Sequence, residues 1–317
     1  MALRTRRRRS PISVPSGVGV LVMRRWTQRT HLAALLVLAV AACARREHVP
    51  ARGGIAVTDD AGRQVTLAAP GRRIVSLLPS FTEILFAIGA GDRLVGRTTW
   101  CDYPPEALAV PSVGDGMPPS VEAVAARRPD LVVLYRSGPN VTAAEQLERL
   151  GIRTVLFDLN LLEELGPVAR RLGILTGRRA AADSLARVMD SLAAQPPTPS
   201  TQSLVFIVWD NPPIVIGAGS YLDRLAALAG ARNVFHDIGS PSAQVSIETI
   251  AARDPDFVAL LSDSAVPPRY AARPEWRVVR AVRTARFLFL PGQLFGRPGP
   301  RAAEAIRELR RRLEAAP

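Results

Sequence analysis

The sequence predicts an α/β protein of two lobes, each with a mainly parallel sheet, joined by one long connecting α-helix. The first reason is an internal repeat. Residues 120–135 and 246–261 are identical at nine of sixteen aligned positions, and a repeat with so long a period indicates two related domains. The second reason is that short apolar runs alternate with helix-like segments along both halves of the chain, which is typical of α/β folds.

The N-terminal segment is predicted to be an export signal followed by a tether. Residues 1–42 contain eight arginines and no acidic residue, and they end in an unbroken apolar run of 11 residues. Such a run is too short to span a bilayer but typical of a signal-peptide core. We expect Cys43 to be lipidated after cleavage and residues 43–53 to form a flexible tether. Ordinary secretory cleavage is the alternative, and the true start is either Met1 or Met23.

Each copy of the repeat predicts a helix followed by a buried strand. Ser120 and Ser246 are suited to cap a helix N-terminus, because their hydroxyls can accept a free backbone N–H. Pro129 and Pro255 end the helix, since proline cannot continue it. The apolar runs that follow are typical of strands buried in a parallel sheet.

The flanking segments extend this alternation into two Rossmann-like lobes, residues 54–160 and 196–317. Residues 161–195, rich in Ala, Leu and Arg, predict the connecting helix, and a single helix between lobes favours a cleft that closes little on binding. Strands are predicted at 74–78, 94–96, 153–157, 204–209, near 233 and at 287–290, and helices at 80–88, 142–150 and 221–229.

Composition and single residues exclude several function classes. The net charge of +13 is concentrated in the N-terminal segment, and no basic stripe with interleaved aromatic residues follows it, so nucleic acid is not expected as a partner. His236 is the only histidine of the two lobes, which excludes a His-based metal cluster; it is expected to lie in a loop, with a ligand contact as the alternative. Cys101 has no predicted neighbouring base and is expected to be a buried free thiol. We therefore expect no catalytic residue, no metal site and no cofactor.

Three segments, 73–90, 99–107 and 114–117, carry the most specific sequence pattern. They resemble the helical-backbone class of importer binding proteins, which carry cobalamin, siderophores or haem, and the similarity covers roughly residues 54–315. The Asp-Tyr-Pro-Pro element after Trp100 is most similar to the cobalamin-binding branch. The resemblance implies a monomeric periplasmic lipoprotein that touches the membrane only through its anchor. It would deliver a small ligand to an ABC permease dimer with its ATPase subunits.

The resemblance also implies a ligand cleft between the lobes, lined by aromatic residues suited to a flat macrocycle. Ser242 stands where the cobalamin branch can carry Trp, Asp115 where an aromatic can stand, and Gln293 where an acid can stand. We expect cobalamin or a related corrinoid, with a ferric siderophore or haem as the alternative. A non-transport lipoprotein or an enzyme on the same scaffold is the alternative from another class. The expected ligand-binding residues are Trp100, Tyr135, Asp115, Trp209, Ser242, Gln293, Phe295 and Arg297.

Glu122 and Glu248 occupy equivalent positions in the two copies of the repeat. In the family, one Glu on each lobe pairs with Arg on the permease, so the resemblance implies that these two residues dock the protein. A carboxylate in the first turn also stabilises its own helix by about 0.3–1 kcal/mol, and a purely structural role is the alternative.

Overall fold

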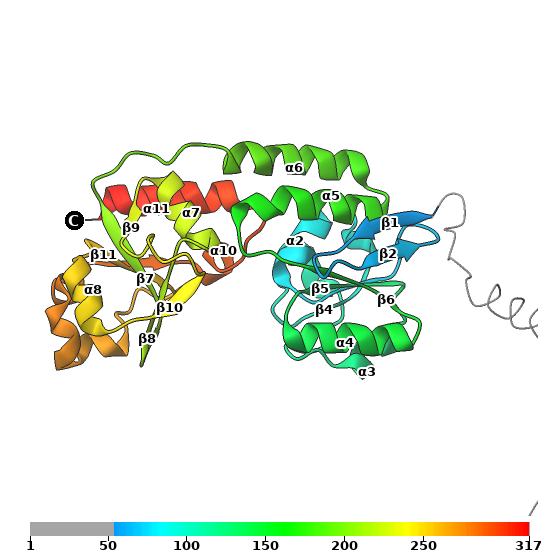
Figure 1. Cartoon of the computed structure of the whole chain (residues 1–317), viewed down its shortest axis with the longest axis horizontal. Helices are drawn as coiled ribbons and strands as arrows, with labels where there is room; N and C mark the ends of the chain where they lie inside the picture. The colour runs from blue at the N-terminus through cyan, green and yellow to red at the C-terminus, as the bar shows by residue number, and fades with distance from the viewer. Residues whose placement is uncertain (1–53, 317) are drawn as a thin grey trace, which may run out of the picture. The chain divides into compact units, whose positions relative to one another are not determined.

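The computed structural model describes residues 54–316, and within them the predicted α/β fold of two lobes is confirmed (Figure 1). The predicted signal peptide, the lipidation of Cys43 and the tether lie outside the described residues. In this described part of the chain, no helix combines the length and the apolar character needed to cross a membrane.

The first lobe is built on a parallel sheet with the strand order β4-β3-β5-β6. Its elements are the hairpin β1 Ile55–Thr58 and β2 Gln64–Leu67, then β3 Ile74–Ser76, α2 Pro79–Ala87, β4 Leu94–Arg97, α3 Val121–Ala126, β5 Leu131–Tyr135, α4 Gly138–Arg149 and β6 Arg153–Phe157, with short 3₁₀ turns at Gly91–Arg93, Pro105–Ala109 and Leu162–Glu164. Along β5, Leu131 and Val133 pack on the α2 side, whereas Val132 and Leu134 pack against α3 and α4. Because both faces are covered, the first four residues of this strand are all apolar and buried.

The second lobe has a mixed sheet in the order β10-β8-β7-β11-β12, with β9 paired to the start of β7. Its elements are β7 Ser203–Asp210, β8 Pro213–Ile216, α7 Tyr221–Ala229, β9 Arg232–Asn233, β10 Ser242–Gln244, α8 Ile247–Arg253, β11 Phe257–Leu261, α9 Arg280–Arg283, β12 Phe287–Leu290, α10 Gly292–Phe295 and α11 Ala302–Ala315, with 3₁₀ turns at Arg269–Ala272 and Pro274–Val278. Strands β7, β9, β11 and β12 are parallel, while β8 and β10 are antiparallel additions that the sequence analysis did not predict.

The two copies of the repeat fold alike, as predicted. The hydroxyls of Ser120 and Ser246 each accept a hydrogen bond of 3.2 Å from the backbone N–H three residues further on. Each helix then ends at a non-glycine residue with positive φ, Arg128 at 48° and Asp254 at 44°, shortly before the proline. The backbone therefore repeats along with the sequence.

The aspartate that follows each proline fastens the neighbouring strand. The carboxylate of Asp130 accepts the backbone N–H groups of Arg72 and Arg73, directly before β3. The carboxylate of Asp256 accepts the N–H of Ser203, the first residue of β7, at 2.9 Å. The aspartate at the same position in both copies of the repeat thus has the same structural role, because its carboxylate accepts hydrogen bonds from N–H groups at a strand end.

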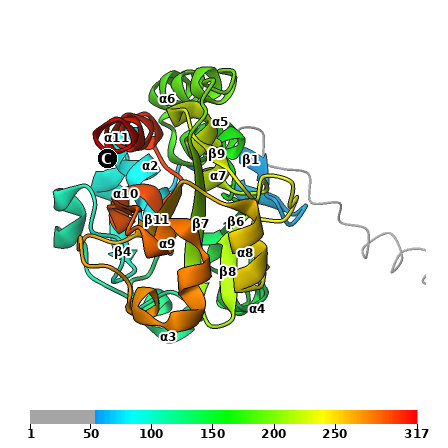
Figure 2. The same cartoon turned by 90° about the vertical axis from the view of Figure 1, so that its left-hand side faces the viewer.

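The connection between the lobes is more complex than the single helix predicted. It consists of two helices side by side, α5 Leu165–Thr176 and α6 Arg179–Ala193 (Figures 1 and 2). The break is at Gly177, whose φ of 66° ends α5 in a left-handed conformation that glycine adopts without strain. Only α6 leads on to the second lobe.

One cluster of buried apolar side chains continues from the first lobe into the second. It includes Ile84 on α2, Val168 on α5, Leu225 on α7 and Leu309 on α11. Because the lobes share this core, moving one against the other would separate packed apolar surface.

Candidate functional site

A cavity of about 650 Å³ lies between the two lobes. It is bounded by residues at or just after the carboxyl ends of β3, β5, β6 and β11, where the loops of an open α/β sheet converge and ligands bind. The first lobe contributes Leu78, Pro79, Ser80, Trp100, Met117, Tyr135, Leu159 and Asn160, and the second contributes Val208, Ile216, Ser220, Tyr221, Leu222, Pro241, Ser242, Leu261, Phe295, Gly296, Arg297 and Pro298.

Trp100 supplies the largest aromatic surface of the cavity and is 61% exposed. Its loop is held from both sides: Thr99 donates to Asp115 at 2.8 Å, and Thr98 and Cys101 are hydrogen-bonded at 3.1 Å. Cys101 is fully buried, which confirms the predicted free thiol. A rigid loop therefore presents an indole to the cavity, which lowers the entropy lost when a ligand packs on it.

The remaining wall is apolar with few polar groups. Met117 is as exposed as Trp100, and the exposed Val208 lines the cavity from the second lobe. The Tyr135 hydroxyl donates to the side-chain oxygen of Asn160 at 2.8 Å. The Tyr221 hydroxyl is buried without a hydrogen-bond partner in the described structure, and burial raises the pKa of Tyr221. These groups suit a largely apolar ligand that carries some hydrogen-bonding substituents.

The loop that starts at α10 is bonded to the first lobe through two arginines and a glutamine. Arg297 donates to Asp102 at 2.5 Å, and Gln293 donates to the same carboxylate at 2.9 Å. Arg301 forms two bonds with the buried carboxylate of Glu83, at 2.7 and 2.9 Å. The loop is thus anchored on both sides of its cavity-lining segment.

The structure brings five of the eight expected ligand residues to the cavity wall: Trp100, Tyr135, Ser242, Phe295 and Arg297. The other three do not line it. Asp115 supports the Trp100 loop, Gln293 is turned toward Asp102, and Trp209 donates its ring N–H to the carbonyl of Asn211 at 2.8 Å.

Several cavity residues were not identified from the sequence, among them Met117, Asn160, Val208 and Tyr221. A strand-end position was the only available signal for Asn160, which follows β6. Val208 faces the cavity because the register between β7 and β8 shifts at this point, and a bulge re-aims side chains in a way that alternation does not predict. His236 instead contacts Asp223 at 2.8 Å and lies outside the cavity wall.

The two glutamates of the repeat are exposed in the first turns of α3 and α8. Both helices lie on the side away from α6 (Figures 1 and 2). A hydrogen bond from its own backbone N–H, together with one from the Ser246 hydroxyl, lowers the pKa of Glu248. This carboxylate is therefore ionised at neutral pH and available to a cationic partner.

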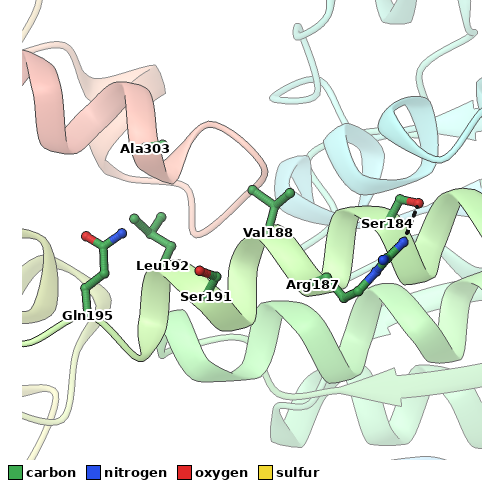
Figure 3. Close-up of a pocket in the computed structure, with 7 residues that line it drawn as sticks. All are labelled: Ser184, Arg187, Val188, Ser191, Leu192, Gln195 and Ala303. Atoms are coloured by element: carbon green, nitrogen blue, oxygen red, sulfur yellow. Dashed lines mark hydrogen bonds between the residues drawn. The ribbon is translucent and has the colours of Figure 1, made fainter.

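A second depression, of about 610 Å³, lies along the outside of α6 (Figure 3). Six of its seven residues belong to α6 or the residues that follow it, and Ala303 comes from α11. Its Arg187 is turned along its own helix toward Ser184, to which it donates at 3.2 Å. Since no polar groups from the lobe loops converge on this depression, the interlobe cavity is the better candidate for a ligand-binding site. Within residues 54–316, no group of three or more His, Cys, Asp or Glu is arranged to hold a metal ion.

Known proteins that are similar to this chain belong to one class, the binding proteins. A family model described as periplasmic binding protein matches residues 74–294. An uncharacterised ABC transporter substrate-binding lipoprotein of Bacillus subtilis, YvrC, is 30% identical over 80% of this chain and 84% of its own length. A vitamin B12-binding protein of Vibrio cholerae is 28% identical over 76% of this chain and 88% of its own.

Solved structures agree with the fold. The periplasmic vitamin B12-binding protein of Vibrio cholerae superposes with a TM-score of 0.64 and 25% identity, covering 78% of this chain and 98% of the other. A periplasmic haem-binding protein from Pseudomonas aeruginosa gives a TM-score of 0.63 and 25% identity, covering 76% and 91%. Proteins named for different ligands are thus about equally similar to this chain.

Proposed function

Because the chain belongs to the periplasmic binding protein family and is the substrate-binding protein of an ABC importer, we propose that it binds cobalamin or a related corrinoid between its lobes. The family is extracytoplasmic and non-enzymatic, and it implies a permease partner and a small ligand. The observation that carries the proposal is the cavity wall, in which the exposed indole of Trp100 stands among apolar side chains, uncharged polar groups and one arginine that is paired with Asp102. Such a wall suits a macrocycle with an apolar face and amide substituents.

Haem is the second candidate. Its support is the haem-binding protein that is 25% identical to this chain, together with two cavity residues: Tyr135 offers a phenol oxygen, and Arg297 offers a cation. A ferric siderophore that carries negative charge would also interact with the Arg297 guanidinium.

Delivery to the permease is assigned to Glu122 and Glu248. Both carboxylates are exposed at equivalent points of the two lobes, so they suit a permease that presents two equivalent arginines. We further propose that Cys43 carries a lipid anchor and that the protein acts as a monomer. The lipoprotein named among the relatives supports the anchor.

The test is calorimetric titration of the mature chain, residues 43–317, with cyanocobalamin, haem and a ferric hydroxamate siderophore in parallel. Saturable one-to-one binding of cyanocobalamin, with weaker binding of the other two, is the expected result. Preferential binding of haem or of the siderophore would refute the proposed ligand but would leave the family assignment unchanged. No binding of any of the three would remove the proposal.

A further inference from the structure

The charge at the edge of the interlobe cavity is already neutralised within the protein. Arg297 is the one charged residue among the described residues that line the cavity. Its side chain is 13% exposed, and its guanidinium donates to one oxygen of Asp102, while Gln293 donates to the other oxygen. Both carboxylate oxygens are therefore engaged, and the cation faces its partner rather than empty solvent.

A second ion pair extends this arrangement. Glu83, on α2, is buried and pairs with Arg301, whose guanidinium also lies 3.8 Å from the centre of the Tyr103 ring. Burial raises the pKa of the Glu83 carboxyl. The positive charges of Arg301 and Arg297 oppose this rise, whereas the negative charge of Asp102 adds to it. The four charged groups therefore influence one another. Two acids of the first lobe and two arginines of the second form a cluster with no net charge.

We propose that Asp102 is a specificity-determining residue, which makes the cavity select a ligand with a neutral, amide-bearing periphery over one that carries carboxylates. The inference rests on the proposed function, in that it refines which member of the corrinoid, haem and siderophore group fits. A ligand carboxylate at this edge meets an arginine that is already paired. It must either displace Asp102 or lie beside it, and like charges brought together in a partly buried site repel strongly.

A neutral amide meets no such cost. Its carbonyl can accept a hydrogen bond from the remaining guanidinium N–H groups, because an arginine has five donors and Asp102 occupies only part of them. The same paired cluster therefore admits amides and rejects carboxylates.

The probes that test this differ in one charge. They are cyanocobalamin and its monocarboxylate, in which a single peripheral amide has been hydrolysed, with haem as a dicarboxylate of another class. For the wild type, we expect affinity for cyanocobalamin at least about tenfold higher than for the monocarboxylate. In Asp102→Asn, we expect this ratio to fall at least about fivefold through a gain for the anionic probe.

Three variants make the result specific. Glu106→Gln changes the net charge by the same amount at an exposed position on the same segment, and the ratio should stay within twofold of the wild type. Arg297→Gln uncovers the Asp102 carboxylate and should widen the preference for the neutral probe. The double variant Asp102→Asn with Arg297→Gln should lose the gain for the anionic probe.

The proposal is overturned if Asp102→Asn leaves the ratio as Glu106→Gln does, or if the wild type prefers the monocarboxylate. If the melting curve shows that Asp102→Asn does not fold, the Arg297→Gln variant provides the test. A smaller preference of that variant for cyanocobalamin over the monocarboxylate would then refute the inference. Absence of cyanocobalamin binding by the wild type refutes the proposed function instead. The haem arm then still tests Asp102, since haem must bind more tightly to Asp102→Asn than to the wild type.

Discussion

Trp100→Ala removes the main aromatic surface of the cavity and should weaken cyanocobalamin binding without loss of folding. The side chain is 61% exposed, so its removal leaves no cavity in the core. The loop itself is held by Thr99 with Asp115 and by Thr98 with Cys101, and none of these contacts involves the indole.

The magnitude follows from the area that a ligand can still cover. A tryptophan side chain buries up to about 250 Å², so an exposed fraction of 61% corresponds to roughly 150 Å². A flat ligand on one face of the ring covers about half of this, and at about 25 cal/mol per Å² the loss is near 2 kcal/mol. Since each 1.4 kcal/mol is a factor of ten, we expect the Kd to rise about 20- to 30-fold.

Calorimetry at 25 °C on matched protein samples measures this change directly. Leu108→Ala, a similarly exposed apolar position that does not line the cavity, is the control, and its Kd should stay within twofold of the wild type. A rise in Kd below threefold for Trp100→Ala, or an equal rise for both variants, would refute the stacking geometry. Trp209→Ala, near the C-terminal end of β7 and outside the cavity wall, should weaken binding less than Trp100→Ala does.

Three further results are expected. Although partial burial raises it, hydrogen bonds from Arg280 and Ser203 hold the pKa of Asp256 below its ordinary value of 3.8, so its contribution to stability is present above that pH and lost as pH falls further. Asp256→Asn should therefore cost about 1–2 kcal/mol at neutral pH in urea denaturation, and a difference that did not shrink below about pH 4 would contradict the linkage. Gly173→Ala would place a Cβ 2.3 Å from that of Ala182 and should lower the unfolding free energy by about 1–3 kcal/mol; Ala182→Gly added to it should restore most of the loss, and failure to do so would point to another cause. Glu122→Gln with Glu248→Gln should reduce transport in cells while leaving ligand affinity unchanged, and Glu145→Gln, exposed on α4, should affect neither; unchanged transport in the double variant would exclude the docking role.

Much of the secondary structure could be predicted because its causes are local. Ser120 and Ser246 cap their helices through an N–H only three residues away, and the apolar run of β5 reports burial on both faces. The break between α5 and α6 had a local signal too, since Gly177 follows an apolar helix and suits a left-handed end. Gly177 was not recognised as a helix end, and one continuous helix was therefore expected.

Strands β8 and β10 had no comparable signal. Each is four residues or fewer, and what makes them strands is their pairing with β7 and with each other. The segment that holds Ser242 pairs with residues about 26 positions earlier, at Ile216. Short strands of this kind are stabilised by partners rather than by their own residues.

By itself, the sequence determined the α/β class and the duplicated helix and strand, because these depend on spacing, capping and periodicity within a few residues. Trp100 was identified through the resemblance to importer binding proteins. The tertiary structure alone decided which polar groups line the cavity and which are paired within the protein. Arg297 and Gln293 were expected to meet it, yet both donate to Asp102, 195 and 191 residues away. A hydrogen bond depends on the distance and direction between two groups in space, and only packing of the two lobes brings such remote side chains together.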